Sequence, residues 1–260
     1  MNLEETKVIA AALILGLLVG SFLNVCIHRV PLGMSIVRPA SRCPRCGFEL
    51  RWYQNVPILS YLLLRGKCAS CKVRISIRYP MVEALTGLLF LLVFHCFGIS
   101  WATPVYWVFV ATLVVITFID LDHQIIPDVI SLPGIVVGFL TALMVPWLSW
   151  TDSLFGILLG GGSLFLVAEV YQRLTGQEGM GGGDVKLLAM IGAFLGWKAV
   201  LPVIFFGSLA GSLVGVPLML LKRSDGKLAI PFGPFLALGA LICLFWGRQL
   251  FDWYVRFFAR

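Results

Sequence analysis

The chain has 260 residues and a formal net charge of +7, and 59% of its residues are hydrophobic while only 13% are charged. Soluble domains are about half apolar and about a quarter charged, so a soluble globular protein is excluded. A disordered chain is excluded as well, because 19 Phe and 8 Trp would not stay exposed to water. The apolar stretches are continuous and do not alternate, which predicts an all-α membrane protein and argues against a barrel.

About eight transmembrane helices are expected. In chain order they cover approximately residues 8–27, 81–98, 105–119, 129–148, 154–171, 184–197, 200–221 and 228–250. Gly16, Gly20 and Ser21 recur at helical spacing in the first, where small residues let a second helix approach closely. Eight spans with the N-terminus outside place fifteen of the twenty basic residues in cytoplasmic loops, in agreement with the positive-inside rule.

Three parts follow from this pattern: a first transmembrane helix at 1–27, a cytoplasmic loop domain at 28–79 and a membrane core at 80–260. The loop carries ten basic residues and a single acid, Glu49. We attribute this positive charge to the orientation of the chain in the membrane, with basic loops on the cytoplasmic side, and to contact with anionic membrane lipid. No nucleic-acid partner is expected. Glu83, just beyond the loop, is expected to face the folded surface of the loop.

Four cysteines of this loop form two C-x-x-C pairs. They are Cys43, Cys46, Cys68 and Cys71. Each pair offers two thiolates from one tight turn, and two turns complete a tetrahedral shell, which predicts a structural zinc-type site. Reduced thiols without metal and an iron–sulfur cluster are the alternatives, although iron–sulfur proteins use other spacings. Metal would supply much of the folding energy of so polar a loop.

Acidic residues inside apolar sequence are the candidates for chemistry, because a carboxylate at membrane depth is costly. Asp120 and Asp122 end the third expected span, and Asp184 begins the sixth at the same membrane face. Two carboxylates held close share one proton, as in aspartic proteases. The ionised member takes a proton from the attacking water, while the protonated member polarises the amide carbonyl.

The glycine-rich segment before Asp184, Gly181-Gly182-Gly183, is expected to form a substrate loop. Glycines let a substrate backbone come close and allow unusual backbone dihedrals.

Other interpretations of these acids stay open from the residues alone. Asp184 is compatible with a charge at a helix N-terminus, and Asp120 and Asp122 with a position in headgroup water. Asp120, Asp122, His123 and Asp128 are also compatible with a cation site in a transporter, since carboxylates and imidazole bind metals.

Several motifs in a fixed order resemble the prepilin peptidase (type IV leader peptidase) family across nearly the whole chain. They are Gly20-Ser-Phe-Leu-Asn-Val25, Arg29-Val-Pro31, Ser41-Arg-Cys-Pro-Arg-Cys46, Asn55-Val-Pro-Ile-Leu-Ser-Tyr61, Arg65-Gly-Lys-Cys68, Arg78-Tyr-Pro80 with Glu83, Asp120-Leu-Asp-His123 with Pro127-Asp128, and Gly181-Gly-Gly-Asp184.

The resemblance implies an intramembrane aspartic peptidase of the G-x-G-D type in a bacterial inner membrane. It implies that Asp120 and Asp184 are the catalytic pair, with Asp122 of the same motif in reserve. The substrates would be type IV prepilins or type II secretion pseudopilins, whose short basic leader would be cut off after a Gly and before a residue that is commonly Phe. The four-cysteine loop is typical of members that also methylate the new N-terminus with S-adenosylmethionine. A peptidase without methyltransferase activity and a cation transporter are the rival functions.

Overall fold

The computed structural model describes residues 3–177, 179–222 and 230–258. Those residues form helices joined by turns, with no strand among them beyond two isolated bridges. The all-α expectation is therefore confirmed. Within the described residues, six helices are long and apolar enough to cross a membrane, which makes this a multipass membrane protein. The chain divides into two compact units, residues 1–115 and 116–260. The three-part division expected from sequence stays a prediction.

The first unit contains a pair of packed helices and the cysteine loop. Its elements are α1 (Leu3–Arg29), the 3₁₀ turn η1 (Trp52–Asn55), α2 (Leu59–Leu63), α3 (Arg78–Phe97) and the larger part of α4 (Ala102–His123). A Cβ built on Gly16 would lie 2.8 Å from the Cα of Gly87, and one on Gly20 would lie 2.7 Å from the Cα of Glu83. The small residues of α1 therefore do bring α3 close, as expected.

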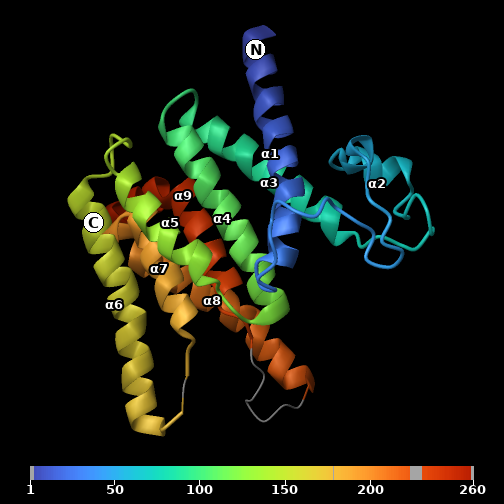
Figure 1. Ribbon diagram of the computed structural model, residues 1–260. Coiled ribbons are helices and arrows are strands. Elements are labelled where there is room, and N and C mark those ends of the chain that lie inside the picture. The colour runs from blue at the N-terminus through green and yellow to red at the C-terminus, as the bar shows by residue number, and fades with distance from the viewer. Residues whose placement is uncertain (1–2, 178, 223–229, 259–260) are drawn as a thin grey trace. The chain divides into compact units, whose positions relative to one another are not determined.

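The second unit continues from the end of α4. It adds α5 (Asp128–Thr141), α6 (Trp150–Thr175), α7 (Gly182–Leu195), α8 (Trp197–Lys222) and α9 (Gly233–Phe258). α7 packs against α5, α6, α8 and α9, so its residues from Leu187 to Phe194 are all buried. Figure 1 shows α6 and α7 running side by side, joined by the glycine-rich turn that precedes Asp184. The apolar core of this unit thus positions the start of α7.

At two of the eight expected spans, the observed helix is shorter than the hydrocarbon core of a membrane. α5 and α7 have 14 residues each, or about 21 Å of helix, against a hydrocarbon core of about 30 Å. The fourth span was expected to reach Leu148, but α5 ends at Thr141. Pro146 lacks an N–H and disfavours helical dihedrals at Val145, so the chain turns there. The count of about eight spans is therefore approximate.

The last expected loop and span also differ from the structure at their junction. The loop was expected at 222–227 and the last span from residue 228. Of these residues, 223–229 lie outside the described residues. Lys222 is described as the last residue of α8. Residues 230–232 of that expected span are not helical, and α9 begins at Gly233.

Candidate active site and metal site

Asp120 is a buried carboxylate in the last turn of α4, with 5% of its surface exposed. Its Oδ2 accepts a hydrogen bond of 2.9 Å from the backbone N–H of Gly233, the first residue of α9. The fold thus brings together two positions that are 113 residues apart. Sequence reasoning singled out Asp120 but missed Gly233. The only signal was the Gly233-Pro234 pair, since proline is favoured in the first turn of a helix.

Asp184 lies in the first turn of α7 and is partly buried. It lies within electrostatic range of Asp120. Ile126 connects the two positions: a Cβ built on Gly183 would lie 2.9 Å from the Ile126 Cβ, and one on Gly233 would lie 3.3 Å from the Ile126 Cδ1. The structure therefore brings Asp120 and Asp184 together at one end of the second unit. Two like charges that interact in this way disfavour simultaneous ionisation.

Asp122, the reserve candidate, is exposed at the end of α4. Asp120 two residues earlier is buried, because positions two apart on a helix face different directions. Of the two aspartates in this motif, only Asp120 thus lies in the apolar interior, where a carboxylate needs a function or a partner.

The three glycines before Asp184 are important because they have no side chains, and not because of their backbone dihedrals. Gly181 precedes α7 with φ −73° and ψ 143°, which any residue adopts, and none of the three has a positive φ. The unusual dihedrals expected from sequence are thus not found. Gly183 faces Ile126 closely, whereas a Cβ on Gly182 would meet no atom within 4 Å. Gly183 is required by packing, and the exposed Gly181 and Gly182 leave open space beside Asp184.

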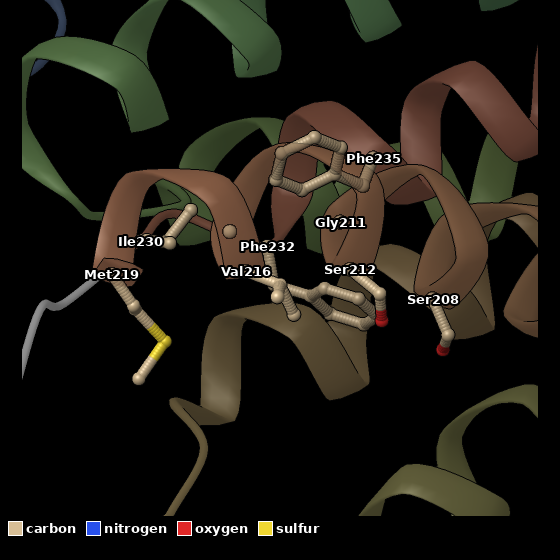
Figure 2. Close-up of a pocket in the computed structure, with 9 residues that line it drawn as sticks. Ser208, Gly211, Ser212, Val216, Met219, Ile230, Phe232 and Phe235 are labelled. Atoms are coloured by element: carbon tan, nitrogen blue, oxygen red, sulfur yellow. The ribbon is translucent and has the colours of Figure 1, made fainter. Parts of the chain in front are cut away.

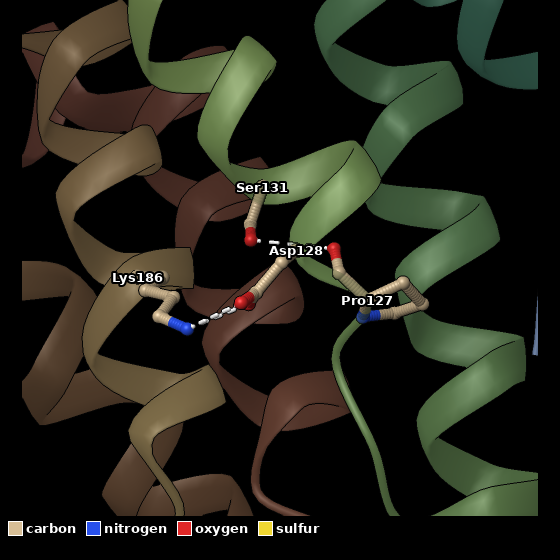
Figure 3. Close-up of polar contacts among 4 residues, drawn as sticks. All are labelled: Pro127, Asp128, Ser131 and Lys186. Carbon is tan, nitrogen blue, oxygen red and sulfur yellow. Dashed lines mark hydrogen bonds and ion pairs between the residues drawn. The ribbon is translucent and has the colours of Figure 1, made fainter.

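Lys186 and Asp128 form an ion pair between α7 and α5. The Nζ of Lys186 donates to Oδ1 of Asp128 at 2.6 Å and to Oδ2 at 2.8 Å (Figure 3). Ser131 Oγ donates to the carbonyl of Pro127 at 3.3 Å and closes the first turn of α5. The pair joins the segment after Asp120 to the segment around Asp184.

A charge swap tests whether this ion pair aligns the two segments. Asp128→Lys or Lys186→Asp alone should lower the peptide cleavage that the family resemblance implies about fivefold, because a partly exposed ion pair contributes up to about 1 kcal/mol. The double swap should restore cleavage, measured as initial rates in membranes with equal amounts of enzyme. A double swap as slow as the single variants would contradict this alignment.

A groove of about 390 Å³ lies between α8 and the start of α9. Figure 2 shows Ser212 and Gly211 of α8 opposite Phe232 and Phe235, which flank Gly233 in the chain. The groove therefore borders the backbone that contacts Asp120.

The four cysteines converge as predicted. Their sulfur atoms all lie within 4.8 Å of one another, with Cys43 and Cys71 3.8 Å apart and Cys46 and Cys68 3.9 Å apart. Zn–S bonds of about 2.3 Å in a tetrahedron place sulfurs roughly 3.8 Å apart, so this cluster has the dimensions of a Cys₄ metal site. Backbone N–H groups of Cys46 and Arg45 lower the pKa of the Cys43 thiol, which favours the thiolate that binds metal.

The two cysteine turns have the same backbone geometry. Cys43 N–H donates to the carbonyl of Phe48, and Cys68 N–H donates to that of Val73, in each case five residues on. The residue four positions after each first cysteine has a positive φ, 70° at Gly47 and 58° at Lys72. The loop thus contains two copies of one metal-binding turn, and the sequence hid this repeat because a lysine replaces the second glycine.

Glu83 faces the loop, as expected. Its Oε2 accepts a 2.8 Å hydrogen bond from the backbone N–H of Ile58, and only 8% of the residue is exposed. Asn24 of α1 donates to the carbonyl of Tyr79 at 3.1 Å. Within the first unit, the Glu83 bond thus attaches the cysteine loop to α3, and the Asn24 bond joins α1 to the first turn of α3.

Comparisons with known proteins place the chain in a family. Residues 14–97 match the bacterial peptidase A24 N-terminal domain, and residues 107–216 match the type IV leader peptidase family. The prepilin leader peptidase/N-methyltransferase of Pseudomonas aeruginosa is 40% identical over 96% of this chain and 94% of its own length. The proteins of the same description from Neisseria gonorrhoeae and Myxococcus xanthus are 43% and 49% identical, over 89% and 82% of this chain and 88% and 64% of theirs. No solved structure gives a significant match.

Proposed function

The chain belongs to the type IV leader peptidase family, and we propose that it cleaves the basic leader from type IV prepilins or type II secretion pseudopilins and methylates the new N-terminus. The chain is an aspartic peptidase by family, and its relatives are named for both activities. The single observation that carries the peptidase proposal is the buried Asp120 within electrostatic range of Asp184. Cleavage takes place at the cytoplasmic face of the inner membrane, with the N-terminus outside.

The pair acts on the amide that follows the leader. One carboxylate is ionised and takes a proton from water, and the other carries a proton toward the carbonyl oxygen. The exposed Gly181 and Gly182 beside Asp184 leave room for an extended substrate backbone. The apolar helix of the substrate lies along the spans, with its cytoplasmic end at the two aspartates.

Methyl transfer requires S-adenosylmethionine, which supplies an electrophilic methyl group to the free amine. The first unit, with the cysteine loop attached through Glu83, is our candidate for this activity because residues 14–97 form a matched domain separate from the peptidase match at 107–216. Zinc held by Cys43, Cys46, Cys68 and Cys71 would be structural, since four protein ligands leave no open position.

The proposal is tested with purified protein, a synthetic prepilin peptide and S-adenosylmethionine carrying an isotope-labelled methyl group. Mass spectrometry should find a product without its leader and with one labelled methyl. A shortened product without the label would leave a peptidase alone. An intact peptide, after several substrates from both secretion systems, would favour the transporter alternative.

Removing metal ligands should separate the two activities. Cys43→Ser with Cys46→Ser leaves two thiolates, which cannot hold the metal that folds the loop. We expect cleavage within about threefold of wild type and loss of methylation, together with loss of bound zinc and faster proteolysis of residues 28–79. Cys96→Ser, at an exposed cysteine outside the cluster, is the matched control and should change neither activity. Normal methylation by the double variant would refute the role of the loop.

A further inference from the structure

The backbone N–H of Gly233 donates directly to the candidate catalytic carboxylate. The bond from N to Asp120 Oδ2 is 2.9 Å and buried. A Cβ on residue 233 would lie 2.6 Å from Oδ2 and 3.3 Å from Cγ of Asp120, so any side chain there would displace the carboxylate. The glycine is therefore required by Asp120, whose Oδ2 occupies the space that a side chain would need.

This hydrogen bond makes the two aspartates chemically unequal. Gly233 begins α9, where N–H groups lack helical partners and the helix dipole favours negative charge. An N–H binds an ionised carboxylate more strongly than a neutral carboxyl, so this hydrogen bond favours the ionised form of Asp120. Asp184 also lies in the first turn of a helix, but in the part of the chain that the structure describes its carboxylate accepts no hydrogen bond.

We propose that Gly233 is a positioning residue that makes Asp120 the ionised member of the pair, so that Asp184 carries the proton. The inference rests on the proposed function and assigns the roles within it. Because the two charges repel, stabilising the anion at Asp120 also favours the proton at Asp184. Gly233 thereby decides which aspartate is the base.

The reaction then balances without another reagent. Water forms a bond to the carbonyl carbon as its proton passes to Asp120, and the proton of Asp184 passes to the carbonyl oxygen. The resulting diol collapses as the C–N bond breaks. Asp120 returns its proton to the leaving amine, and one hydroxyl of the diol returns a proton to Asp184. The products are a carboxylic acid and an amine, and the pair regains its starting state.

The sharpest test replaces Gly233 by glycolic acid through nonsense suppression in the full chain, which exchanges this one N–H for an ester oxygen. The acidic limb of the pH profile for kcat/KM should move to higher pH by about one unit, because the ionised pair has lost a charge-assisted hydrogen bond. A merely structural role would lower the rate without moving the limb.

Leucic acid in place of Leu236 is the matched control. It removes an N–H from the same turn of α9, one that donates to the carbonyl of Phe232. The acidic limb should not move. A limb that moves equally in both esters, or in neither, would overturn the proposal.

Gly233→Ala is the second variant and needs no suppression. Its Cβ displaces Oδ2, so we expect at least tenfold slower cleavage and a limb shifted in the same direction. Gly211→Ala of α8, whose Cβ would meet Phe235 at an ordinary 3.4 Å, should cleave normally. Unaltered cleavage and an unaltered limb in Gly233→Ala would contradict the assignment.

Asp120→Asn separates this proposal from the proposed function. An Asp120→Asn enzyme that cleaves like wild type would overturn the catalytic pair itself. An inactive Asp120→Asn enzyme, combined with an unmoved limb in the glycolate variant, would overturn only the role of Gly233.

Discussion

Asp120→Asn and Asp184→Asn should each slow leader cleavage by about 10³-fold or more, because a positioned acid or base contributes roughly 10²–10⁴ and the two aspartates act as one unit. Asparagine keeps the shape of the side chain and can neither take nor give a proton. The measurement is the conversion of a prepilin in membranes that contain equal, correctly inserted amounts of each variant. The double variant should be no slower than either single one.

Asp122→Asn is the matched control within the same motif. Asp122 is exposed where Asp120 is buried, so its loss should change the cleavage rate less than about threefold. If Asp122→Asn were inactive while Asp120→Asn cleaved normally, the assignment would move to the reserve residue.

Gly192→Ala and Gly156→Ala should each prevent stable folding of the second unit. A Cβ on Gly192 would collide with the backbone carbonyl of Gly156, and a Cβ on Gly156 with that of Gly192, so no side chain can move aside. Overpacking typically costs 1–3 kcal/mol, and roughly the upper end or more applies where backbone meets backbone. Ser153 of α6, which donates to the carbonyl of Ala193 at 2.8 Å, would lose its partner as α6 and α7 separate.

The measurement is the yield and thermal unfolding of purified protein in detergent, followed by cleavage activity. Gly162→Ala is the control in the same helix, since a Cβ there meets no atom within 4 Å. It should leave folding intact or stabilise it slightly, because alanine is the better helix former. A Gly192→Ala protein as stable as wild type would show that α6 and α7 are not held at backbone contact.

Local patterns in the sequence predicted the parts of the molecule that depend on local spacing. The apolar runs predicted the helices, and the C-x-x-C spacing predicted the four-cysteine cluster, because two tight turns suffice to bring four sulfurs together. Gly16 and Gly20 correctly indicated the close packing of α1, because a helix with small residues on one face admits a neighbour there.

Contacts between distant backbone groups could not be predicted in this way. The donor to Asp120 is a main-chain N–H 113 residues away, and every residue except proline carries such a group. The end of α5 was missed because the residues after Thr141 stay apolar; Val145 and Leu148 are buried in the non-helical segment between α5 and α6. The proximity of Asp120 to Asp184 was expected because both predicted helix ends lie at the same membrane face. The hydrogen bond from Gly233 to Asp120, which makes the two aspartates unequal, could be found only in the structure.

The most direct test of the central claim is the intact mass of one prepilin expressed with wild-type enzyme and with Asp184→Asn, in cells where both enzymes are shown to insert equally. We expect a pilin that has lost its leader and gained one methyl group with wild type, and a full-length, unmethylated precursor with Asp184→Asn. A leader removed equally well by both enzymes would contradict the claim that Asp120 and Asp184 form the catalytic pair.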